Sequence, residues 1–363
     1  MLRHVFKFFI LSVLTATGSI NLAQNFSLSR EIHLNNILQE TSGLLYCNSG
    51  FISHNDSGGK PELYVVDSTN GKIINTVLIE GAVNRDWEDI AEDDNYFYIG
   101  DFGNNSGSRT DLRIYQVKKP QNILLKTSLK LKNTFYFKFE DQTDFKKNFR
   151  ETPFDCEAFF VINNIAYIFS KNWHNQTTSL YKLPLDGNIK TAKKISTLDA
   201  DCLITSADFN ENINTIACTG YKKGFPIKTV LIFIGFNPQN ESITFFKRYN
   251  MNYCNHQIEG LTWINNNKLC ISNEYSKKIP AKLVCLDLNT QNELTLTKFN
   301  NNKYKIILPE KYYGKYVIKN KLGQVLYGSK IKRKQKTIII EMPNGAHKLF
   351  IEGQRLIAWF FIP

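Results

Sequence analysis

The sequence predicts an all-β protein: a β-propeller of five blades, with six blades as the alternative, followed by a small C-terminal β-sandwich. Three observations lead to this fold class. Aromatic residues make up 13% of the chain and alanine is scarce, a composition that favours strands. A short phrase followed by strand-like runs recurs along the middle of the chain. Residues 301–363 then change to an alternating, lysine-rich pattern that is typical of a small antiparallel sandwich.

The recurring phrase marks the start of each predicted blade. Its five copies are Glu40–Leu45, Trp87–Ala91, Cys156–Phe160, Ile204–Asp208 and Ile258–Thr262. Three copies carry a glutamate at the same place, whereas Ser42 and Thr205 stand there in the other two. Up to four short strand-like runs follow from each copy, at a period of roughly 45–70 residues, which indicates propeller blades.

The fifth unit lacks a clear fourth strand after Asp287. The alternating run Phe26–Leu34 precedes the first unit and has the length of one outer strand. We expect it to pair with the fifth unit, because this would join the two ends of the propeller and cover both exposed edges. The long interval 118–153 is expected to hold one outer strand and an insertion, and a sixth blade there is the alternative.

The N-terminus has the pattern of a secretory signal peptide. Arg3, His4 and Lys7 precede a short apolar run, Phe8–Leu14, and cleavage is expected near Ala23 and Gln24. The apolar run is far shorter than the roughly 20 residues that span a bilayer. We therefore divide the chain into a signal peptide (1–24), a propeller (25–299) and a C-terminal domain (300–363), and expect a monomer secreted or carried to the cell surface by way of the periplasm.

Charge is distributed unevenly along the chain. The net charge is +12, but residues 301–363 carry +10 and residues 25–300 carry none. The absence of a general basic field argues against nucleic acid as a partner. The seven cysteines include no CxxC pair and no zinc-type spacing, and several, such as Cys218 and Cys270, lie in apolar runs where we expect small buried side chains. Export would allow one or two disulfides, whose pairing the sequence leaves open.

In a propeller, the start of a blade's first strand and the end of its second strand lie at the same mouth of the channel. Acidic residues at the strand starts include Asp86, Asp89, Asp155 and Asp201. The candidate ligand-binding residues at the starts of the first strands and the ends of the second strands are Glu40, His54, Asp56, Glu88, Asp101, Glu157, Lys171, His174, Glu259 and Glu274. Converging carboxylates repel one another unless they share protons or surround a cation. An oxygen-rich lining suits Ca²⁺ or another divalent cation, for which Glu88, Glu157 and Glu259 are the candidate ligands. Alternatively, each acid only caps neighbouring backbone amides.

Two functions remain open at this point. The chain contains no Gly-x-Ser-x-Gly, His-Glu-x-x-His or Walker pattern, and no catalytic residue is assigned. This favours a non-catalytic binding or scaffold protein for a small molecule or a glycan. The alternative is a metal-dependent hydrolase of the lactonase or phosphoesterase type, in which His54 or His174 would carry protons.

The first hundred residues also show a resemblance. The phrases Glu40–Leu44, His54–Tyr64, Asp86–Ala91 and Ile99–Asn105 resemble secreted β-propeller proteins of Bacteroidota related to the SdiA-regulated family. The resemblance extends over about residues 35–290 and implies a propeller fold and export. Related propeller families include metal-dependent lactonases and phytase-like esterases whose channel acids hold calcium or another divalent ion. Ser42 and Thr205 depart from that pattern of acids.

The C-terminal phrases Asn320–Leu326 and Met342–Ile351 resemble the type A sorting domain of type IX secretion. The usual Tyr-Pro-Asn-Pro opening and the lysine tail are missing, so the signal has diverged. The resemblance implies that residues 301–363 engage the type IX secretion machinery and that the propeller folds without them. The alternative is a basic surface for an anionic partner.

Overall fold

The computed structural model describes residues 26–187, 190–254, 257–276, 279–288, 294–300, 302–309, 312–333, 335–353 and 356–362. The expected signal peptide lies outside these residues. The protein is all-β, and three short 3₁₀ helices are η1 (Asn36–Leu38), η2 (Ile123–Leu125) and η3 (Glu211–Ile213). Within the described part of the chain, no helix is long and apolar enough to cross a membrane.

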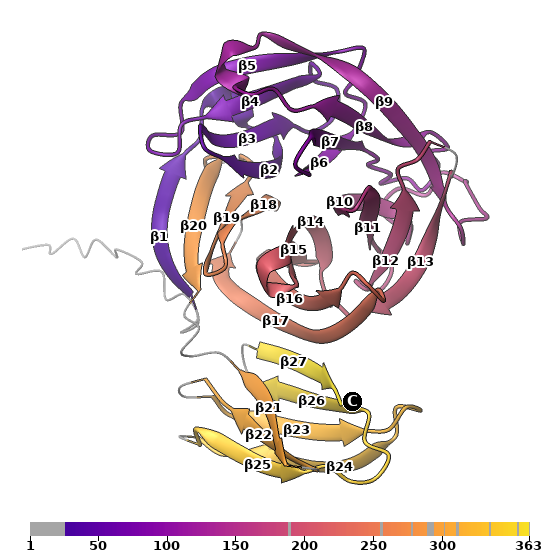
Figure 1. Ribbon diagram of the computed structural model, residues 1–363, viewed down its shortest axis with the longest axis vertical. Helices are drawn as coiled ribbons and strands as arrows, with labels where there is room; N and C mark the ends of the chain where they lie inside the picture. The colour runs from indigo at the N-terminus through magenta and orange to yellow at the C-terminus, as the bar shows by residue number, and fades with distance from the viewer. Residues whose placement is uncertain are drawn as a thin grey trace, which may run out of the picture.

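Residues 26–288, which we call the N-terminal unit, contain groups of antiparallel strands arranged about a common centre (Figure 1). The groups are, from the innermost strand outward: β2 (Thr41–Cys47), β3 (Gly50–Asn55), β4 (Glu62–Val66), β5 (Ile73–Glu80); β6 (Trp87–Glu92), β7 (Tyr96–Asp101), β8 (Leu112–Lys118), β9 (Ser128–Phe139); β10 (Asp155–Ile162), β11 (Ile165–Lys171), β12 (Thr178–Pro184), β13 (Thr191–Leu198); β14 (Leu203–Asn210), β15 (Thr215–Lys222), β16 (Lys228–Asn237), β17 (Ser242–Cys254); β18 (Ile258–Asn265), β19 (Lys268–Asn273), β20 (Lys282–Leu288), β1 (Phe26–His33). Each copy of the recurring phrase lies at the start of an innermost strand.

Large side chains fill the spaces between neighbouring groups. Between the β10 and β14 groups, the Phe160 ring stacks on Tyr167 and meets Phe236 edge-on, all three buried. Apolar burial of this kind provides most of the stability, at about 25 cal/mol per Å². Because each sheet buries both faces in this way, most residues of the innermost strands are buried, including polar ones such as Asp89, Thr205 and Ser206.

The pairing expected for Phe26–Leu34 is confirmed. Strand β1 lies antiparallel to β20, with Phe26 opposite Leu288 and His33 opposite Lys282. A register shift between Leu28 and Arg30 interrupts the alternation, and Leu28 is exposed rather than buried. The first and last strands of the N-terminal unit therefore belong to one sheet.

A disulfide links the neighbouring strands β19 and β20. Cys270 lies directly opposite Cys285 in the register, and the two are bonded. Cys270 is buried, as expected, and its cross-strand position also brings its sulfur next to that of Cys285, which gives one of the disulfides whose pairing the sequence left open. Cys218 is buried and free, as expected.

Between residues 118 and 153, the structure has one strand, β9, of 12 residues, preceded by η2. It pairs antiparallel with β8 and continues parallel to both β5 and β13 at its two ends. The long strand thus joins the outer edges of three neighbouring groups, which matches the expected outer strand of this interval.

Residues 294–362 form a second set of strands, the C-terminal unit. Its strands are β21 (Thr295–Asn300), β22 (Lys303–Ile307), β23 (Gly314–Lys319), β24 (Val325–Ile331), β25 (Thr337–Glu341), β26 (Lys348–Gly353) and β27 (Leu356–Phe361). Strand β21 pairs with β22, so the boundary placed between residues 299 and 300 cuts through a strand of this unit.

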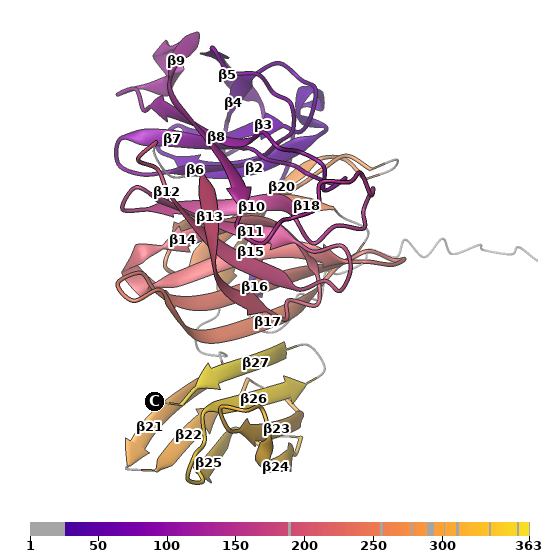
Figure 2. The same ribbon diagram turned by 90° about the vertical axis from the view of Figure 1, so that its right-hand side faces the viewer.

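The two units share a sheet. Strand β27 pairs antiparallel with the outer strand β17, which gives the order β14-β15-β16-β17-β27-β26-β23-β24 (Figures 1 and 2). The Trp359 ring stacks on Phe246 at 5.6 Å, and one apolar core contains residues of both units. Backbone pairing and packing together make the C-terminal unit part of the folded body.

We predict that removing residues 26–34 lowers the free energy of unfolding of the whole N-terminal unit by several kcal/mol. Phe26, Ile32 and Leu34 are buried, and each Å² of lost apolar burial costs about 25 cal/mol. Urea unfolding followed by tryptophan fluorescence measures the change. A shortened chain with the midpoint of the full chain would contradict the role of β1.

We also predict that Trp359→Ala destabilises the N-terminal unit, at a cost of about 3–5 kcal/mol for a large buried aromatic. The control is Tyr327→Ala, an exposed aromatic of the C-terminal unit, which should change stability by less than about 0.5 kcal/mol. Calorimetry would disprove the shared core if Trp359→Ala left the main unfolding transition unchanged.

Candidate functional site

The innermost strands share an irregularity at their first residues. The register shifts between Trp87 and Asp89, between Cys156 and Ala158, between Ile204 and Ser206, and between Ile258 and Gly260, and β2 shifts between Ser42 and Leu45. In four strands the extra residue is the one that the repeat aligns: Glu88, Glu157, Thr205 and Glu259. A bulge changes the direction of its side chain. We call the end of the N-terminal unit where these strands begin the acidic end.

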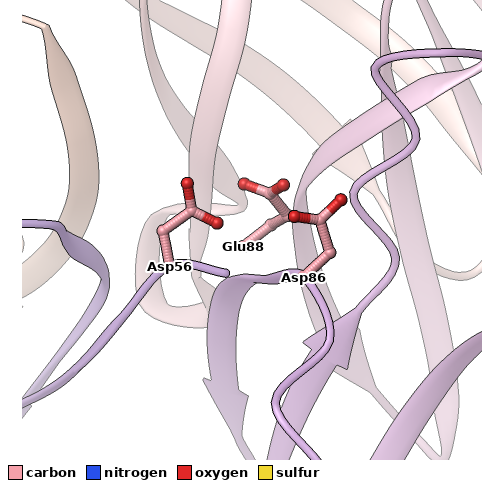
Figure 3. Close-up of side chains that lie close together, drawn as sticks. All are labelled: Asp56, Asp86 and Glu88. Atoms are coloured by element: carbon pink, nitrogen blue, oxygen red, sulfur yellow. The ribbon is translucent and has the colours of Figure 1, made fainter. Parts of the chain in front are cut away.

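Three carboxylates meet at the acidic end (Figure 3). Asp56 follows β3, Asp86 precedes β6, and Glu88 occupies the bulge of β6. One oxygen from each lies within 4.8 Å of the others. Glu88 is buried, and Asp56 and Asp86 are half-buried. We call these three residues the carboxylate triad.

Gly103 provides the space for the triad. A Cβ atom at this position would overlap Glu88 Oε1 and Asp86 Oδ2. The backbone around Gly103 is fixed, because its amide donates to the Asp86 carbonyl at 3.3 Å and its carbonyl accepts from Arg109 Nη1 at 2.9 Å. The loop after β7 is thus held against the triad by main-chain and guanidinium contacts.

Asp101, a candidate ligand, has a supporting role. Its fully buried carboxylate accepts hydrogen bonds from Arg109 Nη2 at 3.0 Å and Arg113 Nε at 2.8 Å. It also accepts from the Asp86 amide at 3.2 Å. Two guanidinium groups therefore neutralise Asp101, and its contact with Asp86 positions the triad.

The triad lacks comparable neutralisation. Within the described residues, the Glu88 carboxylate accepts no hydrogen bond and forms no ion pair, and the nearest cation to Asp86 is Arg109 at 4.0 Å. Burial, followed by the charges of Asp56 and Glu157, raises the pKa of Glu88 well above its usual value. Burial and Asp56 raise the pKa of Asp86 to about 7, and burial raises the pKa of Asp56 to about 6. Within the described residues, the only protein groups on these carboxylates are the Ser57 amide, which donates to Asp56 Oδ1 at 2.5 Å, and Arg109, 4.0 Å from Asp86, which leaves the chemistry of a cation site.

Glu157 and Glu259 are not members of the triad, although the charge of Glu157 acts on Glu88. Glu157 pairs with the buried Lys171 ammonium, which also lies over the Trp173 and Tyr221 rings. Burial would lower the pKa of Lys171, but Glu157 and neighbouring acids raise it well above its usual value. Glu259 is buried and its Oε1 has no hydrogen-bond partner in the described structure. Of the three predicted metal ligands, Glu88 alone belongs to the carboxylate triad. The other two members of the triad are Asp56 and Asp86.

Neither histidine can serve the triad. His54 is fully buried, its ring meets Trp87 edge-on at 5.5 Å, and burial lowers its pKa to about 4, so it is neutral. His174 lies on the surface with Nε2 against the Glu151 carbonyl oxygen. The expectation that one of them faces the site as a proton carrier was wrong. The strand alternation turns His54 inward, and the loop after β11 turns His174 outward.

The two remaining candidates are glutamates at the rim. Glu40 is exposed, and its carbonyl accepts from the Asp56 amide at 2.9 Å. Glu274 is half-buried, and burial followed by Asp56 and Glu157 raises its pKa to about 8. Glu40 thus positions a triad residue through its backbone, whereas Glu274 adds to the excess negative charge.

A hollow of about 630 Å³ lies at the opposite ends of the innermost strands. Its lining includes Tyr46, Glu92, Asp208 and Trp263, and none of the candidate residues. Asp208 accepts from the Trp263 amide at 2.8 Å, and burial raises its pKa to about 6. Asp208 thus bonds the neighbouring strand β18, whereas Asn210 and Asn265 bond amides of their own turns.

Comparisons with known proteins add little. No family model matches the sequence, and no curated protein matches it. Among solved structures, the chain is similar to a hypothetical protein from Leishmania major, with 10% sequence identity and a TM-score of 0.42. That similarity covers 72% of this chain and 90% of the other.

We predict that, without divalent cations, the protein loses stability as pH rises from about 4 to about 8. The unfolded chain releases these carboxyl protons near pH 4, whereas the folded chain keeps them to about pH 6 at Asp56, 7 at Asp86 and 8 at Glu274. The folded state binds more protons throughout this window, so the free energy of unfolding decreases with rising pH. Melting curves in a chelator measure this. A rising or flat profile would show that the acids are already neutralised.

Proposed function

We propose that this chain is a non-catalytic ligand-binding β-propeller of five blades that holds a divalent cation at the acidic end of its channel. The carboxylate triad carries this proposal. Asp56, Asp86 and Glu88 converge within 4.8 Å, and within the described residues their carboxylates meet only the Ser57 amide, on Asp56, and Arg109, 4.0 Å from Asp86. A cation among them would remove the repulsion that raises their pKa values.

Contacts among the inner strands support the propeller. Each of β2, β6, β10 and β14 contacts the next in order, and β18 contacts both β14 and β2. The pairing of β1 with β20 supplies the outer strand of the fifth blade. We propose a propeller up to Leu288 and a C-terminal sandwich from Leu294 onward.

Calcium suits the triad best among common ions. The cluster offers only carboxylate oxygens, and no cysteine or histidine takes part in it. Ca²⁺ accepts six to eight oxygen ligands in flexible geometry, so three side chains would leave positions for water or for a ligand's oxygens. A small molecule or glycan with hydroxyl or carboxylate groups is the class of ligand that could complete such a shell.

The side chains around the triad favour binding over catalysis. A metal-dependent hydrolase needs a group that carries protons near the cation. His54 is buried against Trp87, His174 faces away, and Lys171 is paired with Glu157. Hydrolysis is therefore the less supported alternative.

We further propose that the protein is exported as a monomer and acts outside the cytoplasm. The signal-like residues 1–24 and the resemblance to secreted propellers of the SdiA-regulated type support this. The resemblance of residues 301–363 to a type IX sorting domain supports contact with that secretion machinery. Because β27 pairs with β17, engagement of the tail would involve strands that are part of the folded body.

Calcium titration of the full chain tests the cation site. At a free Ca²⁺ concentration 100 times Kd, binding should stabilise the fold by about 2.7 kcal/mol. Asp86→Asn should abolish this gain, and in a chelator it should melt at a higher temperature than the parent, because it removes one of the mutually repelling acids. The exposed Asp94→Asn, at the opposite end of the channel, is the matched control and should behave as the parent.

The outcomes separate the site from general charge effects. Calcium stabilisation of the parent and of Asp94→Asn, but not of Asp86→Asn, supports the site. Equal calcium responses in all three proteins, or none in the parent chain, would disprove it.

A further inference from the structure

The hairpin of β23 and β24 exposes a run of apolar side chains. Leu322 at its tip is 82% exposed, Val325 is 63% exposed and Tyr327 is 52% exposed. Leu326 between them is also exposed. Val325 and Tyr327 lie on one face of β24 and Leu326 on the other, so the exposed apolar side chains gather at the hairpin tip, and such a gathering often marks a contact site. The position lies in the C-terminal unit, so it is independent of the cation site.

The tip is held in a defined conformation. Asn320 Oδ1 accepts from the amides of Leu322 and Gln324, both at 3.0 Å. The Asn320 amide donates to the Gln324 carbonyl at 3.0 Å, and its side-chain Nδ2 donates to Gln324 Oε1 at 2.8 Å. This ordered turn holds Leu322 outward. Its insertion into a binding partner would therefore cost little conformational entropy.

Basic side chains lie along the same hairpin: Lys319 and Lys321 adjoin the tip, whereas Lys315 and Lys330 lie opposite each other toward its open end. Residues 312–333 contain no acidic residue, and their basic residues are Lys315, Lys319, Lys321, Lys330, Lys332 and Arg333. Within the described residues, Lys321, Lys330 and Lys332 form no ion pair, whereas Lys315 pairs with Glu352. The hairpin thus combines an apolar tip with two adjoining lysines, further basic residues along its strands and no acid.

The hairpin also lies where a flat surface could reach it. Strand β24 is the last strand of the shared sheet, at the end opposite β14. Figures 1 and 2 show it on the far side of the C-terminal unit from the N-terminal unit. Six of its seven residues are exposed.

We propose that the β23–β24 hairpin binds anionic lipid membranes. Leu322 and Val325 enter the region between the headgroups, and Lys319 and Lys321 beside them contact the lipid phosphates. Anionic lipids attract basic residues near the membrane surface, and apolar insertion adds to the binding. An acidic polysaccharide would use the lysines alone and would leave the exposed apolar tip unexplained, so the lipid surface accounts for both observations.

Vesicle flotation of the full chain tests this proposal. We expect binding to vesicles of phosphatidylcholine with about one third phosphatidylglycerol, and at least about tenfold weaker binding to phosphatidylcholine alone. Leu322→Asp combined with Val325→Asp should reduce binding to the anionic vesicles about tenfold or more. The matched control is Ile339→Asp, an apolar residue of β25 that is 62% exposed and should bind as the parent does.

Other results would overturn the proposal. These are no binding to anionic vesicles, equal binding to both lipid mixtures, or unchanged binding of the Leu322 and Val325 double variant. In the last case, retention on a dextran sulfate column would identify the hairpin as a site for polyanions instead. Melting temperatures of all variants, which change only exposed side chains, check that each is folded.

Discussion

The register shift at the start of each innermost strand is the feature on which the site depends. In β6, β10 and β18 the shift changes the direction of a glutamate side chain. In β14 it does the same for Thr205, whose hydroxyl donates to the Ile258 carbonyl at 2.5 Å. In β2, Ser42 makes the same kind of contact with the Glu88 carbonyl at 2.6 Å. Hydroxyls at this place therefore bond the neighbouring strand, whereas glutamates extend toward the acidic end. Since the repeat places these residues together, the excess negative charge follows from the fold.

Buried acids at this end divide into two kinds. Asp89 accepts hydrogen bonds from the amides of Ile90, Phe159 and Ala207 and so joins three innermost strands. Asp155 accepts from the Asn104 amide and from Trp173 Nε1. These residues have the structural role that strand-start acids often have, namely to satisfy backbone and side-chain donors. The triad differs because its oxygens face one another. An unpaired buried charge is costly, which is the physical reason to expect a cation there.

Several features could be predicted from the sequence because their causes are local. The alternation of Phe26–Leu34 and the missing fourth strand after Asp287 indicated the β1–β20 pairing. Glu88 was identified as a candidate because it occupies the aligned position of the repeat. Asp56 was identified because it follows the second strand of its unit. Asp86 was visible as an acid two residues before Glu88, but only the loop at Gly103 shows that it joins them.

Other features depend on partners distant in sequence. Strand β27 pairs with β17, more than 100 residues away, and no local pattern in the sequence indicates that contact.

The central claim is that the carboxylate triad holds a divalent cation. The most direct measurement is anomalous diffraction from crystals grown with Ca²⁺ and, in parallel, with Mn²⁺. This account predicts an anomalous peak about 2.3–2.6 Å from oxygens of Asp56, Asp86 and Glu88 in the calcium crystals. Clear side-chain density with no anomalous peak at this position, and with the Glu88 carboxylate hydrogen-bonded to a protein donor, would contradict the account.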